Sequence, residues 1–74
     1  MTLFAKEKAE RLVRLTRREK EVFELLVEGY TLKESADKLN LKYSTVNTHV
    51  TNLYRKLGVR SRAELIILYR SEKI

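Results

Sequence analysis

Side chains able to form hydrogen bonds, most of them short and uncharged, recur between residues 44 and 55. If this segment is a helix that turns about 100° per residue, five of them lie on one side, roughly 100° to 200° from Val46: Asn47, Thr51, Ser44, Arg55 and Thr48. A narrow apolar stripe, facing the core, lies opposite and contains Val46, Val50, Leu53 and Leu57. Exposed helix faces usually carry glutamate and lysine, because serine, threonine and asparagine are poor helix formers. Some property other than helix stability therefore accounts for this polar face.

The chemistry that this face suits is the reading of base edges in a DNA major groove. Asparagine can hold adenine through two hydrogen bonds, and the threonine methyl group can meet that of thymine. A carboxylate in the same helix would be repelled by phosphate, and residues 43 to 57 contain none. The pattern predicts base contacts by Ser44, Asn47, Thr48 and Thr51.

The charge distribution points to the same polyanion. The chain of 74 residues has a formal net charge of +6, and all ten acidic residues lie outside residues 38 to 63. That segment has six basic residues: Lys38, Lys42, Arg55, Lys56, Arg60 and Arg62. A continuous segment free of acid is what a DNA-facing surface needs, whereas a uniform excess of bases would indicate only solubility.

Other kinds of site find no support in the sequence. The chain has no cysteine, and no acidic residue stands at ligand spacing from its only histidine, His49. We therefore expect no metal, cofactor or enzymatic activity. The leading interpretation of His49 is a role in packing or in bonding to the backbone, and the second is a phosphate contact. Gly29 and Gly58 suit helix C-caps rather than a phosphate-binding loop.

Four helices must position these residues. The pattern Ser/Thr-x-x-Glu, which caps the N-terminus of a helix through reciprocal hydrogen bonds, occurs at Thr16, Thr31 and Ser61. It predicts helices over about 16–28, 31–39 and 61–70, and the amphipathic segment 43–57 forms a helix between the last two. Residues 3 to 13 show weaker periodicity through Ala5, Ala9 and Leu12. This segment is a helix or arm that packs on the core, bridges to an upstream domain or stays mobile.

The fold expected is all-α: a compact four-helix domain over 15–74, preceded by an arm or helix over 1–14. The turn Asn40-Leu41-Lys42 joins a short helix to a long polar-faced one, which makes 31–57 a helix-turn-helix. No apolar run reaches the roughly 20 residues needed to cross a bilayer, and no signal peptide is evident. We expect a cytoplasmic protein without membrane contact.

A long set of residues at fixed spacing resembles the LuxR-type (FixJ- or GerE-type) helix-turn-helix domain. It comprises Leu15-Thr16-x-Arg18-Glu19-x-Glu21-Val22, Gly29, Lys33-Glu34-x-Ala36, Leu39-x-Leu41, Thr45-Val46-x-x-His49 and Lys56-Leu57-x-Val59-x-Ser61-Arg62. Two positions depart from the family pattern. Ser35 replaces the usual isoleucine, which loosens the core slightly, and Lys42 replaces a capping serine. Either Lys42 contacts phosphate or Ser44 takes over the cap.

The resemblance implies a bacterial transcription regulator, free-standing or part of a longer protein, whose partner is double-stranded DNA. It places base contacts at Asn47, Thr48 and Thr51 and phosphate contacts at Thr45, Lys56 and Ser61. Charge and position add Lys42, Tyr43 and Arg55 to the phosphate contacts. RNA polymerase is a further candidate partner, and no small-molecule ligand is expected. The alternative function is a protein-interaction module that sequesters a regulator.

The last predicted helix is apolar all round, which a single small core does not require. Pairing through this helix, also common in the family, predicts a homodimer with Leu65, Ile67 and Leu68 at the interface. The alternative is that residues 3 to 13 cover the helix.

Overall fold

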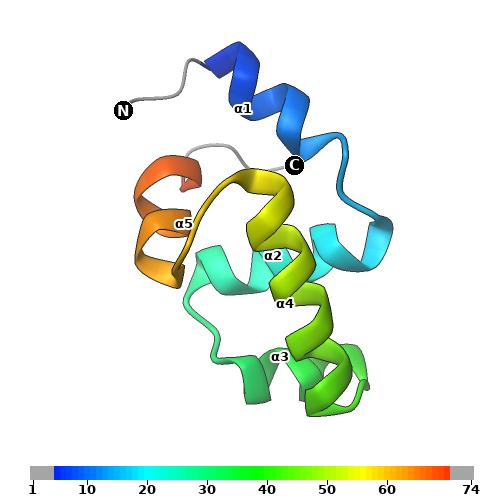
Figure 1. Cartoon of the computed structure of the whole chain (residues 1–74). Helices are drawn as coiled ribbons and strands as arrows, with labels where there is room; N and C mark the ends of the chain where they lie inside the picture. The colour runs from blue at the N-terminus through cyan, green and yellow to red at the C-terminus, as the bar shows by residue number, and fades with distance from the viewer. Residues whose placement is uncertain (1–4, 71–74) are drawn as a thin grey trace.

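Five helices, joined by short connections, form the computed structural model, which describes residues 5 to 70 (Figure 1). They are α1 (Ala5–Leu12), α2 (Arg17–Glu28), α3 (Leu32–Leu39), α4 (Tyr43–Leu57) and α5 (Arg62–Tyr69). The described residues contain no strand, so the all-α prediction is confirmed, and α4 has the predicted bounds. Residues 1–4 and 71–74, the ends of the two predicted segments, lie outside the described part.

The helix starts form largely as their sequence pattern predicts. Thr16 and Glu19 at α2, and Thr31 and Glu34 at α3, each exchange both hydrogen bonds of a capping box. At α5 only half of the box forms: the Ser61 hydroxyl accepts from the Glu64 amide at 3.2 Å, but the Glu64 carboxylate accepts from the Arg60 amide. The hydrogen bonds of Thr31 lower the pKa of the Glu34 carboxyl, and the charge of Lys38 acts in the same direction.

The helix ends depend on left-handed backbone. Gly29 closes α2 at φ 105° and Gly58 closes α4 at φ 70°, both values that favour glycine. Asn40 ends α3 at φ 55° and begins the turn into α4. Asparagine tolerates this conformation better than most residues, so the turn has a local chemical cause.

The core lies where α2, α4 and α5 meet, with α3 closing one end. Its fully buried side chains include Val22, Phe23 and Leu26 of α2, Val46, Leu53 and Leu57 of α4, and Leu65 and Tyr69 of α5. Phe23 and Tyr69 meet edge to face, with ring centroids 6.2 Å apart. Ser35 is also fully buried, but its hydroxyl donates to the Thr31 carbonyl at 2.8 Å, which satisfies the polar atom.

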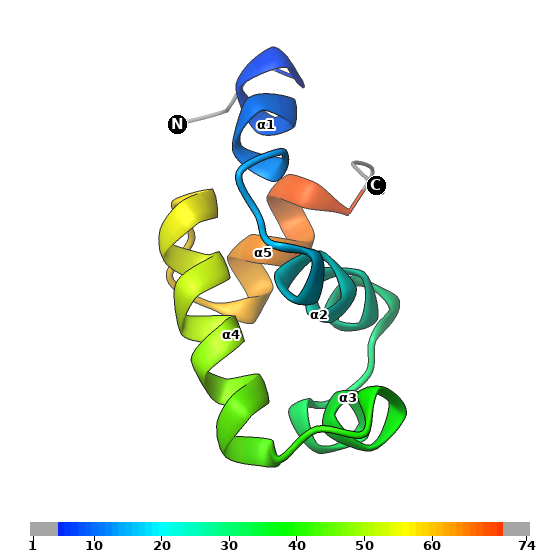
Figure 2. The same cartoon turned by 90° about the vertical axis from the view of Figure 1, so that its right-hand side faces the viewer.

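The N-terminal helix packs on this core, which is one of the three arrangements left open by the sequence. Leu12 and Leu15 are both buried with the core residues. Figure 2 shows α1 at one end of the molecule, near the C-terminal end of α4, and α3 at the opposite end, near its N-terminal end. Arg11 of α1 donates from Nη1 to the Leu57 carbonyl at 3.0 Å. The position of α4 is therefore fixed from both ends.

Candidate nucleic-acid interface

The polar side of α4 is exposed over its first nine residues. Val46 and Val50 point into the core, and four polar side chains on the other side are exposed: Ser44, Asn47, Thr48 and Thr51. We call these four residues the recognition face. They are the residues predicted to contact bases, and the structure brings them together on one exposed surface.

Two hydroxyl groups of the recognition face bond to the helix itself. Thr48 Oγ1 donates to the Ser44 carbonyl at 3.1 Å, and Thr51 Oγ1 donates to the Asn47 carbonyl at 3.0 Å. Such bonds to the carbonyl four residues earlier are common for threonine in helices. They use the hydroxyl hydrogen and leave the oxygen lone pairs and the methyl group for other contacts.

The N-terminal end of α4 has no side-chain cap. Lys42 is the N-cap residue and is exposed. Among the described residues, no side chain, including that of Ser44, bonds the first amides of the helix. Tyr43 beside it is 52% exposed, and Thr45 is half-buried. The start of a helix attracts anions through its amides and its dipole, and Lys42 adds a full positive charge there. This end of α4 suits a phosphate group.

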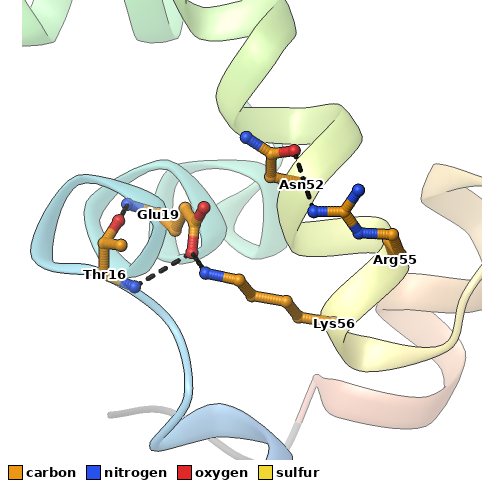
Figure 3. Close-up of polar contacts among 5 residues, drawn as sticks. All are labelled: Thr16, Glu19, Asn52, Arg55 and Lys56. Carbon is orange, nitrogen blue, oxygen red and sulfur yellow. Dashed lines mark hydrogen bonds and ion pairs between the residues drawn. The ribbon is translucent and has the colours of Figure 1, made fainter.

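Lys56 has a partner that the sequence did not reveal. Its ammonium group lies 2.8 Å from Oε1 of Glu19, whose side chain is only 4% exposed. Figure 3 shows Lys56 reaching from α4 to the N-terminal end of α2, where the same carboxylate accepts from the Thr16 amide. The predicted phosphate contact by Lys56 must therefore compete with an internal ion pair.

The Glu19 carboxyl is kept ionised by these contacts. Burial raises its pKa, but the hydrogen bond from Lys56, the amide of Thr16 and the charge of Lys56 together outweigh burial. The net result is a pKa below the ordinary value of 4.5. Glu19 is thus a charged link between α2 and α4.

The other basic residues of the acid-free segment, residues 38 to 63, differ in their exposure and in their contacts within the chain. Lys38 lies over the Tyr30 ring at 4.6 Å, and Arg62 donates to the Leu26 carbonyl at 3.1 Å. Arg55 is exposed and donates to Asn52 Oδ1 at 3.3 Å (Figure 3). Lys42 and Arg60 are exposed, and Ser61 is exposed at the start of α5. Lys42, Arg55 and Arg60 are the bases best placed for phosphate.

The predicted dimer residues of α5 do not share one exposed surface. Leu65 is fully buried in the core of its own chain, so it has no surface to offer a partner. Leu68 is half-buried against the core, whereas Ile67 is 79% exposed. The α1 helix lies against α4 and leaves Ile67 uncovered, so the described part of residues 3 to 13 does not cover this side of α5.

Sites of other kinds are not found in the part of the chain that the structure describes. No group of three or more His, Cys, Asp and Glu side chains between residues 5 and 70 could hold a metal ion. No helix within that range is long and apolar enough to cross a membrane. His49 is half-buried on α4, and its charge contributes to lowering the pKa of Glu19.

Comparison with known proteins adds independent information. Residues 13–69 match the family described as bacterial regulatory proteins, luxR family. The chain is 47% identical over 53 residues to the spore germination protein GerE of Bacillus subtilis (strain 168), covering 72% of each chain. It is 42% identical over 59 residues to the nitrate/nitrite response regulator protein NarP of Escherichia coli (strain K12), covering 80% of this chain and 27% of NarP.

A third relative is much longer. Identity to the HTH-type transcriptional regulator MalT of Yersinia pestis (strain Pestoides F) is 42% over 52 residues, which is 70% of this chain and 6% of MalT. The match to the family covers more than half of the chain and includes all of α2 to α5. The chain therefore belongs to the LuxR family of bacterial regulatory proteins, whose helix-turn-helix domain binds DNA.

Proposed function

We propose that this domain regulates transcription by inserting α4 into the major groove of double-stranded DNA and reading a specific sequence there. The observation that carries the proposal is the recognition face: an exposed, carboxylate-free row of short polar side chains opposite a buried apolar stripe. A major groove about 12 Å wide admits a helix, and side chains of this length reach base edges only when the helix lies deep in it.

The surroundings of the recognition face supply the contacts that position the helix. Lys42 and Tyr43 at the start of α4, with the partly buried Thr45, suit one phosphate strand. Arg55 and Arg60, with Ser61 at the start of α5, suit the other. Phosphate contacts of this kind fix register and orientation, whereas base contacts carry the sequence information.

The proposed active form is a homodimer on DNA, which pairs through the outer side of α5. Ile67 supports this surface because it is the most exposed large apolar side chain among the described residues. A two-fold dimer places its α4 helices on half-sites about 10 base pairs apart, or a multiple of that. Such a regulator acts in the cytoplasm, where RNA polymerase is the further partner its function requires.

The test is selection of bound duplexes from a random DNA pool, followed by titration of the recovered sites at several salt concentrations. We expect one recurrent motif. A plot of log affinity against log salt concentration should have a slope of about −0.9 for each phosphate neutralised. Recovery of no motif, with equal binding to every duplex, would leave only non-specific attraction. Absence of DNA binding at low salt would remove the proposal and favour a protein partner.

A further inference from the structure

The recognition face contains no positive charge. Guanine in the major groove is read most often by arginine or lysine, which donate two hydrogen bonds to O6 and N7. Three cations lie near it. Lys42 precedes α4, and Lys56 is paired with buried Glu19. Exposed Arg55 lies on the same side of α4, one turn beyond Thr51, where it donates to Asn52. The four residues of the recognition face are all neutral.

Two of the three hydroxyl hydrogens that could replace those cations, those of Thr48 and Thr51, are already used. Thr48 and Thr51 donate to main-chain carbonyls within α4, so their oxygens can only accept a hydrogen bond from a base. Guanine offers two acceptors in the major groove, which these oxygens cannot satisfy. Donating to guanine would mean giving up this internal hydrogen bond. The methyl groups of both residues remain available for apolar contact.

Asn47 is the one residue of the face whose side chain carries a donor and an acceptor on two separate atoms. Its amide is exposed, in the second turn of α4. Asn52 is half-buried, and its oxygen is bonded to Arg55, so it does not provide a second reader of the same kind. A free asparagine amide matches adenine, which presents the N7 acceptor beside the N6 donor.

We propose that α4 reads A·T pairs: an adenine facing Asn47, and thymine methyl groups facing Thr48 and Thr51, with no guanine read by hydrogen bonds from these three residues. The inference rests on the proposed function, since it names the bases that the same surface contacts. It assigns the discrimination of thymine to two methyl groups and that of adenine to one amide.

Single-atom changes in the selected duplex test this assignment. Replacing thymine by uracil removes only the methyl group, and replacing adenine or guanine by its 7-deaza form removes only the N7 acceptor. We expect a uracil at the sensitive positions to weaken binding about 3- to 4-fold, near the value for one buried methyl group. One 7-deaza-adenine should weaken it about 5- to 10-fold, and 7-deaza-guanine less than 2-fold.

Matched variants connect each base to its side chain. Thr51→Ser removes the methyl and keeps the hydroxyl, so it should abolish the effect of uracil at one position. Thr51→Val keeps a methyl and removes the hydroxyl, so it should retain that effect. Asn47→Ala should abolish the effect of one 7-deaza-adenine.

Two results would overturn the inference without touching the proposed function. One is a specific site in which replacing a guanine by 7-deaza-guanine weakens binding more than 10-fold. The other is a guanine preference that disappears in Arg55→Ala or Lys42→Ala. Binding without any sequence preference would instead contradict the proposed function, and the inference with it.

Discussion

At the scale of single residues, Glu19 has two roles that the sequence shows only in part. Its spacing from Thr16 predicts the capping box, which the structure contains. Its second contact, to Lys56, joins residues 37 positions apart in the chain, and no local pattern predicts such a pair. The family resemblance implies a phosphate contact for Lys56, but a resemblance does not show which partner the side chain binds within its own chain.

The ion pair makes a specific prediction about Lys56→Met. Removing the ammonium leaves the buried Glu19 carboxylate with fewer partners, so the free energy of unfolding at pH 7 should fall by about 1–3 kcal/mol. Urea unfolding monitored by circular dichroism measures this. Exposed Lys33→Met on α3 is the control and should change stability by less than about 0.5 kcal/mol.

The stability difference between the wild type and Lys56→Met should also depend on pH. Because folding lowers the pKa of Glu19 below 4.5, its ionised form stabilises the native state above that pH, and the contribution is lost as pH falls through the folded pKa. The gap between the wild type and Lys56→Met should therefore narrow below pH 4.5. A gap that stayed constant down to full protonation would show that packing, and not the ion pair, is responsible.

At the scale of elements, helix bounds could be predicted and helix contacts could not. The capping residues and the glycines mark α2, α3 and α4 closely, because caps act within one turn of the chain. Periodicity also separates the buried and exposed sides of α4. On α5 it fails, because apolar residues surround the helix. Only packing decides that Leu65 and Tyr69 point inward while Ile67 points out.

The C-terminal end of α4 depends on two neighbouring helices, and this too is open to test. The Leu57 carbonyl, which no residue of the α4 ladder can satisfy, accepts from Arg11 Nη1 at 3.0 Å and from the Tyr69 hydroxyl at 2.9 Å. Tyr69→Phe keeps the ring against Phe23 and removes the hydroxyl, so it should cost about 0.5–1.5 kcal/mol.

The combination with Arg11→Met should cost more than the sum of the two single changes. With both donors gone, the carbonyl is buried without a partner, whereas each single variant keeps one bond. Thermal unfolding of the wild type, the two single variants and the double variant measures this coupling. Strict additivity would mean that the two bonds act on α4 independently.

At the scale of the whole molecule, the proposed DNA contacts and the exposed apolar side chain of Ile67 lie in different parts of the described structure. The recognition face belongs to the first turns of α4, near α3, whereas α5 lies beside the opposite end of α4 (Figures 1 and 2). This separation would let two copies pair while each keeps its recognition face free.

The prediction for assembly concerns Ile67→Glu. A charged residue at this 79% exposed position should abolish concentration-dependent dimerisation and reduce cooperative binding to paired half-sites, with little change in stability. Val13, 72% exposed before α2, is the matched control, and Val13→Glu should leave assembly unchanged. Sedimentation velocity distinguishes the outcomes. A wild type that is monomeric at every concentration and binds single and paired half-sites equally would contradict the dimer.

The proposed function requires that the exposed polar side of α4 reads DNA sequence. The most direct measurement ranks the affinities of a set of single-base variants of the selected duplex for the wild type and for the triple variant Asn47→Ala, Thr48→Ala, Thr51→Ala. Exposed Glu28→Ala on α2 serves as the control. The triple variant should stay folded, keep salt-dependent binding and lose the ranking, with about 1–3 kcal/mol of discrimination gone at the adenine facing Asn47. An unchanged order of sites in the triple variant would contradict the proposed function.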